Sequence, residues 1–317
     1  MSAVLAEVVR SGFVESLHHG SAIALGPPTG GRESQQIFAL GDVDAPVFPR
    51  STNKPMQAVG MLRCGLSLEP ADLALAAASH SGEQVHVQRV RDMLGSAGLT
   101  DEALRCPPGL PLSEAAAEAA LRTGAGPSRL QMNCSGKHAA MLLTCLAAGW
   151  PIEDYVAPDH PLQRELRAAV EELTGDTVTA VGVDGCSAPV FAVSLRGVAR
   201  AFGRLVTAEA GTHERQVADA MRSHPELVGG TGRDVTALMA GVPGLLAKDG
   251  AEGVYAAALP NGASVALKID DGSARARTPV LVRELRRLGA DGDVLAELSE
   301  VPVLGGGEPV GCVRVAY

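Results

Sequence analysis

Ser51 and Lys54 are the residues whose types and spacing most directly suggest chemistry. They form a Ser-x-x-Lys motif where β-rich sequence gives way to an Ala-rich helical pattern. On a helix that starts near Ser51, both side chains would share a face, and the helix N-terminal amides would stabilise an oxyanion. An uncharged Lys54 amine, favoured by burial and by a cation such as Arg50, could then remove the serine proton. The alternative is that Ser51 only caps the helix.

A second hydroxyl and a second lysine would complete the site of a serine acylase. The segment 79–83, Ser-His-Ser-Gly-Glu, lies between two predicted helices, and the segment 248–250, Lys-Asp-Gly, follows a short predicted strand. The latter is similar in position to the K-T-G element of serine β-lactamases. Each segment also has a structural interpretation, as a capping segment and as a solvated hairpin lysine. Their order along the chain favours the catalytic one.

Cys134 and Cys186 could contribute to a metal site, because both are flanked by glycine and polar residues on predicted loops. Two thiolates, one nitrogen ligand and a water suit tetrahedral Zn²⁺. The nitrogen could come from His138, a common ligand, or from Lys137, which must first lose a proton. The alternative is that both cysteines only fill space in the interior.

The elements that would position these residues alternate between strands and helices. Predicted strands span 3–9, 13–25, 36–40, 178–183, 245–247, 254–259, 263–269 and 310–315. Predicted helices span 52–64, 84–97, 113–122, 136–148, 161–173, 194–206, 212–222 and 275–288. The segment 178–183 is the single strand expected within the helical region.

Strands at both ends of the chain with helices between them predict an α/β (α+β) fold. Residues 1–50 and 244–317 would form one antiparallel sheet. Residues 51–243 would form a large, mainly helical insertion that carries most of the candidate site. The length of 317 residues does not require a second domain, so we expect a single catalytic unit over 1–317.

Charge and composition restrict the partners. The formal net charge of −9 and the absence of a Lys/Arg-rich run disfavour nucleic acids, which leaves a small molecule as the expected partner. Glu7 and Arg10 interrupt the apolar N-terminal stretch, so no signal peptide or membrane anchor is predicted and we expect a cytoplasmic protein. The six scattered cysteines are expected to be reduced thiols.

Taken together, segments along nearly the whole chain resemble the asparaginase II family and follow its order. They are 49–57 (PRSTNKPMQ), 79–83 (SHSGE), 133–138 (NCSGKH), 160–163 (HPLQ), 184–186 (DGC), 230–233 (GTGR) and 248–253 (KDGAEG). The resemblance implies a fold similar to serine β-lactamases and serine-dependent glutaminases.

The resemblance also implies roles for individual residues. It assigns Ser51 as the nucleophile with Lys54 as its base, and Ser81 with Lys248 as a second hydroxyl–amine pair. It implies zinc as the cofactor and favours Lys137 over His138 as the nitrogen ligand. The implied ligands are Cys134, Lys137, Cys186 and a water. His138 and Asp184 would then support the ligands or orient the substrate.

The expected reaction is hydrolysis of L-asparagine to L-aspartate and ammonia. Arg50 or Arg233 could bind the substrate carboxylate, and Glu83 or Asp184 its ammonium group. We also expect a homodimer and no membrane partner. The alternatives are a glutaminase or other amidase on the same scaffold, or a non-catalytic protein that binds metal or a small molecule. After Arg233 the sequence Asp234-Val235-Thr236 departs from the family pattern, so Asp234 receives no role.

Overall fold

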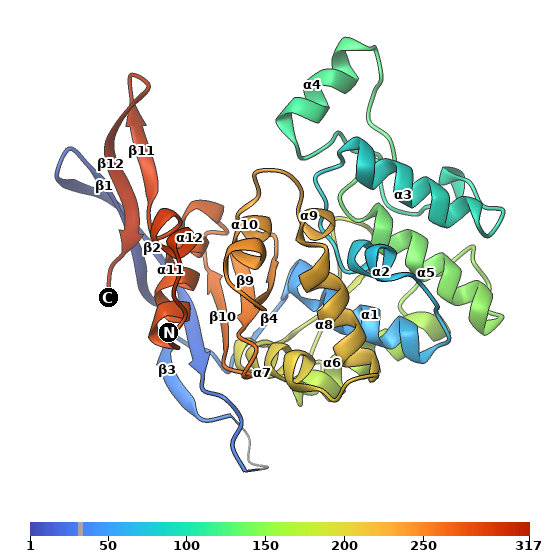
Figure 1. The fold of residues 1–317 in the computed structure, drawn as a ribbon, viewed down its shortest axis with the longest axis horizontal. Coiled ribbons are helices and arrows are strands. Elements are labelled where there is room, and N and C mark those ends of the chain that lie inside the picture. Colours follow the sequence, from blue (N-terminus) through green and yellow to red (C-terminus); the bar gives the residue numbers. More distant parts are fainter. Residues whose placement is uncertain (31–33) are drawn as a thin grey trace.

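The computed structural model describes residues 1–30 and 34–317, and its framework is an antiparallel sheet (Figure 1). The strand order is β11-β12-β1-β2-β10-β9-β8, with β3 paired to β2. The strands are β1 (Ala3–Arg10), β2 (Phe13–Leu25), β3 (Gln36–Leu40), β8 (Leu246–Asp249), β9 (Val254–Ala258), β10 (Ser264–Ile269), β11 (Val301–Gly305) and β12 (Glu308–Val315). Strands from the two ends of the chain are therefore direct neighbours.

Strand β2 is long because it pairs with different strands along its length. Its first half pairs with β1, and its second half, residues 20–25, pairs with β10, with β3 joining from Ala22 onward. The second half is buried throughout, whereas Phe13 and Val14 at the outer end are exposed. A strand segment covered on both faces can be continuously apolar, as this one is from Ala22 to Leu25.

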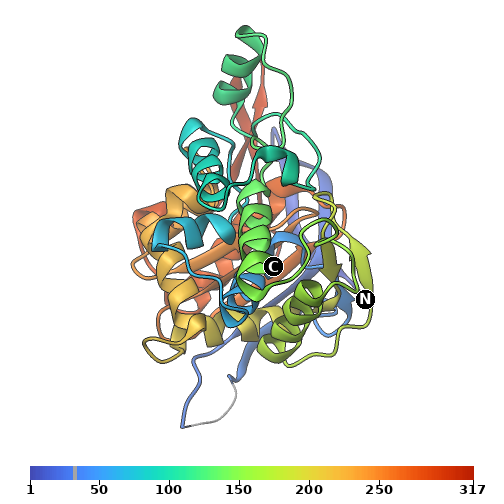
Figure 2. The same ribbon diagram turned by 90° about the vertical axis from the view of Figure 1, so that its right-hand side faces the viewer.

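The helices lie mainly between β3 and β8 in the sequence. They are α1 (Lys54–Arg63), α2 (Pro70–Ala76), α3 (Gln84–Gly95), α4 (Glu114–Arg122), α5 (Ser135–Ala148), α6 (Pro161–Thr174), α7 (Leu195–Thr207), α8 (His213–Ser223), α9 (Pro225–Val228), α10 (Asp234–Gly241), α11 (Ala274–Arg287) and α12 (Asp293–Glu297). Two short 3₁₀ helices are η1 (Arg50–Asn53) and η2 (Asp101–Ala103). Viewed from the helical side, α4 stands away from the rest of the molecule (Figure 2).

Helices α7 and α11 cover opposite faces of the sheet. Arg277 of α11 lies over the ring of Tyr255 on β9, and Gly203 of α7 packs beside Ser264. Ser264 is opposite Ala258 in the β9–β10 register. Since Tyr255 and Ala258 are three residues apart on one strand, their side chains point to opposite faces. The central strands β9 and β10 are therefore almost entirely buried.

The predicted fold class, α/β with an antiparallel sheet drawn from both ends of the chain, is confirmed. The strand predicted at 178–183 is present but shorter, and it is not the single strand of the helical region. The chain there forms β5 (Val181–Val183), which pairs with β6 (Pro189–Phe191), while β7 (Val193–Ser194) pairs with β4 (Pro46–Val47). Strands of two or three residues are too short to show an alternating pattern.

Several short helices also lack a sequence signal. Helices α2, α9, α10 and α12 have seven, four, eight and five residues, below the window in which helical periodicity is recognisable. No helix in the described ranges combines the length and apolar character needed to cross a membrane.

Candidate active site

Lys54 and Ser51 lie at the start of α1, next to the sheet. Lys54 is 1% exposed and Ser51 is 9% exposed. The Lys54 amine donates to the Ala78 carbonyl, to Ser79 Oγ at 3.0 Å and to Cys134 Sγ at 3.1 Å. Within the described residues the Ser51 hydroxyl has no hydrogen-bond partner. The candidate nucleophile is therefore free, and the candidate base is held by three other groups.

A strained turn places Ser51. Arg50 has a φ of 52°, which is unfavourable for a residue with a side chain. Thr52 closes the turn by donating its N–H and its hydroxyl to the Pro49 carbonyl, at 3.2 and 2.8 Å. The Arg50 guanidinium pairs with Asp184 at 2.8 Å, so two predicted substrate-binding residues contact each other across the site.

The structure brings Ser79, rather than Ser81, to Lys54. Ser79 Oγ accepts from the Lys54 amine, and its backbone N–H donates to the Val228 carbonyl at 3.1 Å. Ser81 instead donates to the Gly229 carbonyl at 2.8 Å. The sequence prediction overlooked Ser79. The Ser-His-Ser segment contains it, but the sequence does not show which serine faces the lysine.

His80 ties this serine segment to α5. Its Nδ1 accepts from the Gly82 N–H at 3.1 Å, so the ring proton is on Nε2, which donates to Ser135 Oγ at 2.9 Å. Ser135 in turn donates to the Leu130 carbonyl at 2.8 Å. Burial, together with the neighbouring His86 and Lys54, lowers the pKa of His80 well below its usual value. A neutral His80 therefore acts as a fixed link between the two loops.

Lys248, the last residue but one of β8, carries a fully buried amine. It donates to the carbonyl and to the Oδ1 of Asp249, both at 2.7 Å. Burial lowers the pKa of Lys248 to about 8, against the opposing charge of Asp249, and the charge of Lys54 lowers it further. No hydrogen bond joins Lys248 to Ser81 among the described residues, so that predicted pair is not in direct contact.

Asp249 is the acidic centre of a buried charge cluster. It accepts from Lys248, from Arg233 at 2.6 Å and from Arg277 at 3.2 Å. Burial alone would raise the pKa of Asp249, but Lys248 and the two arginines lower it well below its usual value. Arg233, a predicted substrate ligand, is thereby occupied by an internal carboxylate. Arg277 also donates to the Gly250 carbonyl at 2.8 Å, which fixes the loop after β8.

Asp234, which had no predicted role, joins α10 to α11. It accepts from the Thr278 hydroxyl at 2.6 Å and lies 3.8 Å from the Arg277 guanidinium. These contacts make it part of the support behind Asp249. The sequence could not show this partnership, because Asp234 and Thr278 are 44 positions apart.

Glu83 holds a glycine-containing loop against the serine segment. Its carboxylate accepts from the N–H of Thr231 at 2.8 Å and from the Thr231 hydroxyl at 3.0 Å. Gly230 in this loop has a φ of 124°, and a Cβ there would lie 2.2 Å from Ser81 Oγ. Only glycine fits at this position. Glu83, the fourth predicted substrate ligand, therefore also has an internal partner.

Cys134, Lys137 and Cys186, the three residues that the family resemblance implies as ligands, lie close together. Lys137 Nζ lies 3.3 Å from Cys186 Sγ. The hydrogen bond from the Cys134 thiol and the charge of Lys137 lower the pKa of Cys186, whereas burial raises it. Burial would lower the pKa of Lys137, but the charges of Cys186 and Cys134 raise it. Two sulfur groups and an amine gathered around Cys186 are groups that can bind zinc after losing protons.

His138 lies beside this cluster and is hydrogen-bonded to Tyr155 on the other side of its ring. Tyr155 Oη accepts from the Arg105 N–H at 2.9 Å and contacts His138 Nδ1 at 2.7 Å. This hydrogen bond fits either tautomer of the His138 ring, because a tyrosine oxygen can accept two hydrogen bonds. Nε2 is buried without a partner among the described residues, and the His138 ring is near Cys186. The Nε2–H tautomer would donate to a thiolate, whereas the Nδ1–H tautomer would leave Nε2 able to bind a metal.

Histidine, cysteine and carboxylate groups alone do not form a metal site. Across residues 1–30 and 34–317, no three such side chains are grouped to hold an ion. The converging set described above includes a lysine, which lies outside those residue types. The buried Nε2 of His138 and the paired thiols are the observations that fit a metal there.

One family model and several solved structures are similar to the chain. The model of the family described as L-asparaginase II matches residues 6–315. No curated protein gives a significant match.

The structure of Mglu in its native form is 18% identical with a TM-score of 0.44, covering 86% of this chain and 66% of that one. Mglu in its glutamate form is 16% identical with a TM-score of 0.47, covering 90% and 65%. A β-lactamase from Mycobacterium bovis is 12% identical with a TM-score of 0.45, covering 88% and 95%. The chain thus spans slightly less than two thirds of either Mglu chain.

The charge cluster predicts a large difference between two Asp→Asn substitutions. Asp249→Asn leaves three buried or half-buried cations without their shared carboxylate and should destabilise the fold by about 3–5 kcal/mol. Asp44→Asn breaks the exposed Asp44–Arg196 pair and should cost at most about 1 kcal/mol. Urea unfolding of both variants measures the difference. Equal losses would show that Asp249 is not the electrostatic centre of the site.

Proposed function

The chain belongs to the L-asparaginase II family, and from this premise we propose that it hydrolyses L-asparagine to L-aspartate and ammonia. Family membership supports an amidohydrolase. The observation that carries the mechanism is the buried Lys54 amine bonded to Ser79, one helical turn from the free hydroxyl of Ser51.

In the proposed acylation, Ser51 Oγ attacks the carbon of the side-chain amide. Lys54 donates three hydrogen bonds in this structure, so it must first give one proton to solvent. Its amine then takes the Ser51 proton, and Ser79 carries a proton from Lys54 to the departing nitrogen. The new ester bond joins Ser51 to the aspartyl group while the C–N bond breaks and ammonia leaves. Water then attacks the ester, giving a proton to Lys54, and the second collapse releases aspartate and restores Ser51.

The backbone around Ser51 is arranged for an oxyanion. The Ser51 N–H is at the start of η1, and a Cβ on Gly250 would come within 3.4 Å of that nitrogen. The glycine thus leaves room beside a backbone donor, where an oxyanion could accept a hydrogen bond. Arg277 holds Gly250 in place through its carbonyl, which connects the charge cluster to the proposed oxyanion site.

Substrate recognition is proposed to use groups whose charges are already balanced. Arg50 and Arg233 would share their guanidinium groups between the substrate carboxylate and their partners Asp184 and Asp249. Glu83 and Asp184 remain the proposed contacts of the substrate ammonium, and His138 remains a candidate for orienting the substrate.

Zinc is proposed as the cofactor, held by Cys134, Lys137 and Cys186. Bound there, it would act mainly by orienting the substrate and tuning the site, since Ser51 already supplies a nucleophile. Cys134 also touches Lys54, so the ligand set and the candidate base share one packed region. His138 would support Cys186 through its Nε2 proton.

Three serine substitutions test the reaction. Ser51→Ala should remove turnover, a loss of about 10⁴-fold or more, and Ser79→Ala should lower kcat by about 10²–10⁴-fold because it removes a proton carrier. Ser81→Ala is the matched control, since it loses a bond to Gly229 and should cost about 1 kcal/mol of stability. Ammonia release from asparagine and from glutamine is the measurement.

The outcomes separate the alternatives. Full activity of Ser51→Ala would exclude the mechanism. Release from glutamine but not from asparagine would favour a glutaminase. Failure of the unaltered protein to release ammonia from any amide would favour a non-catalytic metal-binding protein.

The pH profile should report Lys248. In the proposed site Lys248 can accept a proton only in its uncharged form, so kcat should rise as the pH increases through about 8 and Lys248 becomes neutral. Arg233→Gln removes a cation that lowers the pKa of Lys248, so the rise should move to higher pH. Arg196→Gln, far from the cluster, should leave it unchanged. A profile identical in all three proteins would contradict this role.

Metal content tests the ligand set. Elemental analysis of protein purified without added zinc should find stoichiometric zinc, and Cys134→Ser and Lys137→Met should lose it. Cys145→Ser, which changes another buried thiol of α5, should retain the metal. Circular dichroism checks that each variant is folded. If the unaltered protein contains no zinc and is fully active in the presence of chelator, Cys134 and Cys186 are packing residues and not ligands.

A further inference from the structure

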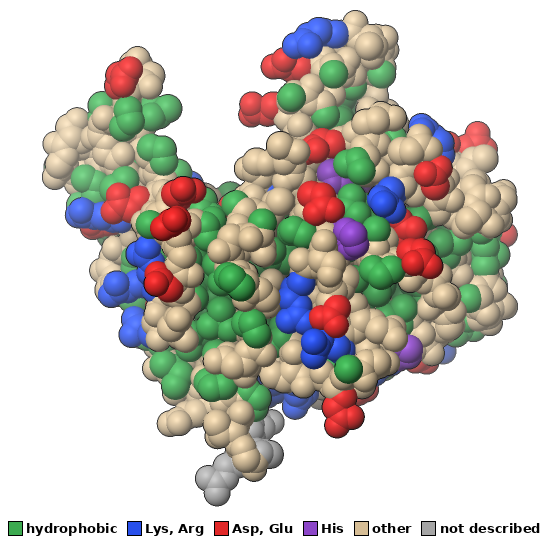
Figure 3. All heavy atoms as spheres, in the orientation of Figure 1, with side chains coloured by type: hydrophobic (Ala, Val, Ile, Leu, Met, Phe, Trp, Pro, Cys, Tyr) green, Lys and Arg blue, Asp and Glu red, His purple; other side chains and the backbone are tan. Residues whose placement is uncertain are grey.

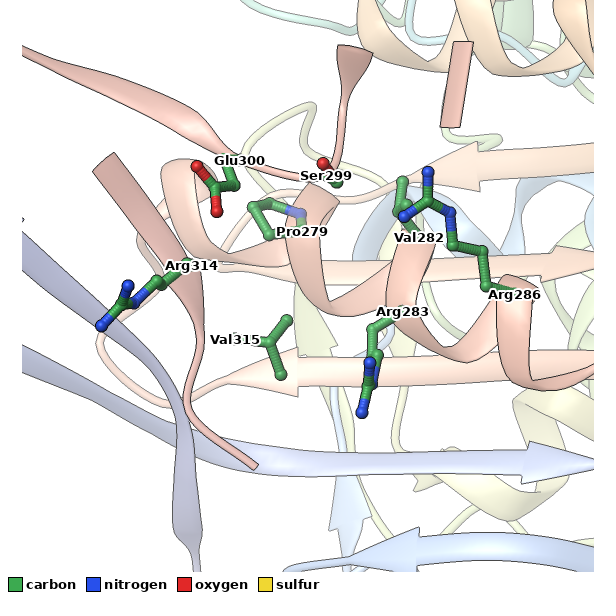
Figure 4. Close-up of a pocket in the computed structure, with 8 residues that line it drawn as sticks. All are labelled: Pro279, Val282, Arg283, Arg286, Ser299, Glu300, Arg314 and Val315. Atoms are coloured by element: carbon green, nitrogen blue, oxygen red, sulfur yellow. The ribbon is translucent and has the colours of Figure 1, made fainter. Parts of the chain in front are cut away.

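A second candidate binding site lies where α11 packs beside the end strands of the sheet. A hollow of about 260 Å³ has an apolar floor made of Pro279 and Val282 of α11 and Val315 of β12. Three arginine side chains surround this floor (Figure 4). They are Arg283, Arg286 and Arg314. A neighbouring hollow of about 290 Å³ is lined by Arg283 and Arg286 as well.

Two of these arginines make no close contact with an acid, although the charge of Arg283 acts on the neighbouring Glu284. Arg283 and Arg286 form no hydrogen bond or ion pair within the described residues. The adjacent Arg287, in contrast, pairs with Glu284 at 2.8 Å and lies 4.3 Å from the ring centre of Phe38. Arg283 and Arg286 are three residues apart on one helix, where like charges repel. An anion bound between the two guanidinium groups would attract both and offset their mutual repulsion.

The positive charge is local. Basic side chains gather on the flank over α11 and β12, beside a few acidic ones (Figure 3), although the chain as a whole carries −9. Arg314 pairs with Glu7 at 2.8 Å, and Glu300 is the one carboxylate in the lining of the hollow. Favourable interaction with the helix dipole accounts for cations in the last turn of α11, but not for the hollow between them.

We propose that this hollow binds a nucleoside phosphate. The unpaired guanidinium groups of Arg283 and Arg286 match phosphate oxygens in geometry and charge, and Val315, the partly exposed residue of the apolar floor, can contact a base. Ser299 donates its proton to the Ala296 carbonyl at 2.7 Å, which leaves its oxygen as an acceptor. With Glu300 it forms a rim that accepts hydrogen bonds from amino or hydroxyl groups.

The site is separate from the candidate active site but shares a helix with it. Arg277, in the first turn of α11, contacts Gly250 and Asp249. At 1.5 Å per residue, Arg283 and Arg286 lie roughly 9 and 14 Å further along the same helix. The proposal does not depend on amide hydrolysis, because it uses none of the residues of that reaction.

Calorimetric titration of the full-length protein at fixed ionic strength tests the proposal. ADP should bind saturably, whereas pyrophosphate and adenosine, which each carry part of the chemistry, should bind at least about tenfold more weakly. The double variant Arg283→Gln/Arg286→Gln should weaken ADP binding by about tenfold or more. The matched control Arg91→Gln/Arg164→Gln removes the same charge from α3 and α6, and the Kd should stay within about twofold.

Three results would overturn it. One is the absence of saturable ADP binding to the unaltered protein. Another is equal weakening by both double variants, which would indicate general attraction of anions to the chain. The third is pyrophosphate binding as tight as that of ADP, which would leave the apolar floor without a role. All four substituted arginines are exposed, and thermal unfolding verifies that the variants fold.

Discussion

The burial of the Lys54 amine is the constraint on which the site depends. An amine removed from water must find hydrogen-bond acceptors, and Lys54 finds them on two separate segments: Ala78 and Ser79 in the loop after α2, and Cys134 at the start of α5. The two segments therefore have to meet at the Lys54 amine. Other hydrogen bonds, such as those of His80 to Gly82 and Ser135, hold these segments in the same arrangement.

A second buried amine, that of Lys248, imposes the same demand from the sheet. Its neighbour Asp249 supplies an opposite charge, and that carboxylate in turn collects Arg233 and Arg277. The result is a polar region in which nearly every charge has an internal partner. Such compensation keeps the region rigid and largely dry, and electrostatic interactions are strongest in such an environment.

Sequence reasoning predicted the fold class because long elements carry clear patterns. Strands β2 and β3 lie at the predicted residues, and the helices of ten or more residues begin and end within a few residues of the predictions. Short pieces such as β6 and α9 escaped because they contain too few residues for a period. In the site, the Ser-Lys and Cys-Lys motifs were recognisable because their members are close in sequence.

Which side chains of the site contact one another could not be predicted from the sequence as the fold class could. Whether Ser79 or Ser81 faces Lys54, and whether Arg50 is free or bound to Asp184, depends on contacts between residues 25 and 134 positions apart. The orientation of the His138 ring depends on a tyrosine hydroxyl and a distant backbone amide. The catalytic and ligand roles themselves remain predictions that the experiments described above address.

The contacts of Lys54 also limit how the protein can be improved. Selection for stability commonly replaces buried polar groups with apolar ones of similar size, but here the group that is costly to bury is also the proposed chemical group. Greater stability would therefore have to come from substitutions outside the site, for example at the exposed outer end of β2. Among natural variants of this protein, the amino acids of the outer strands should vary, whereas those around the Lys54 amine should stay the same.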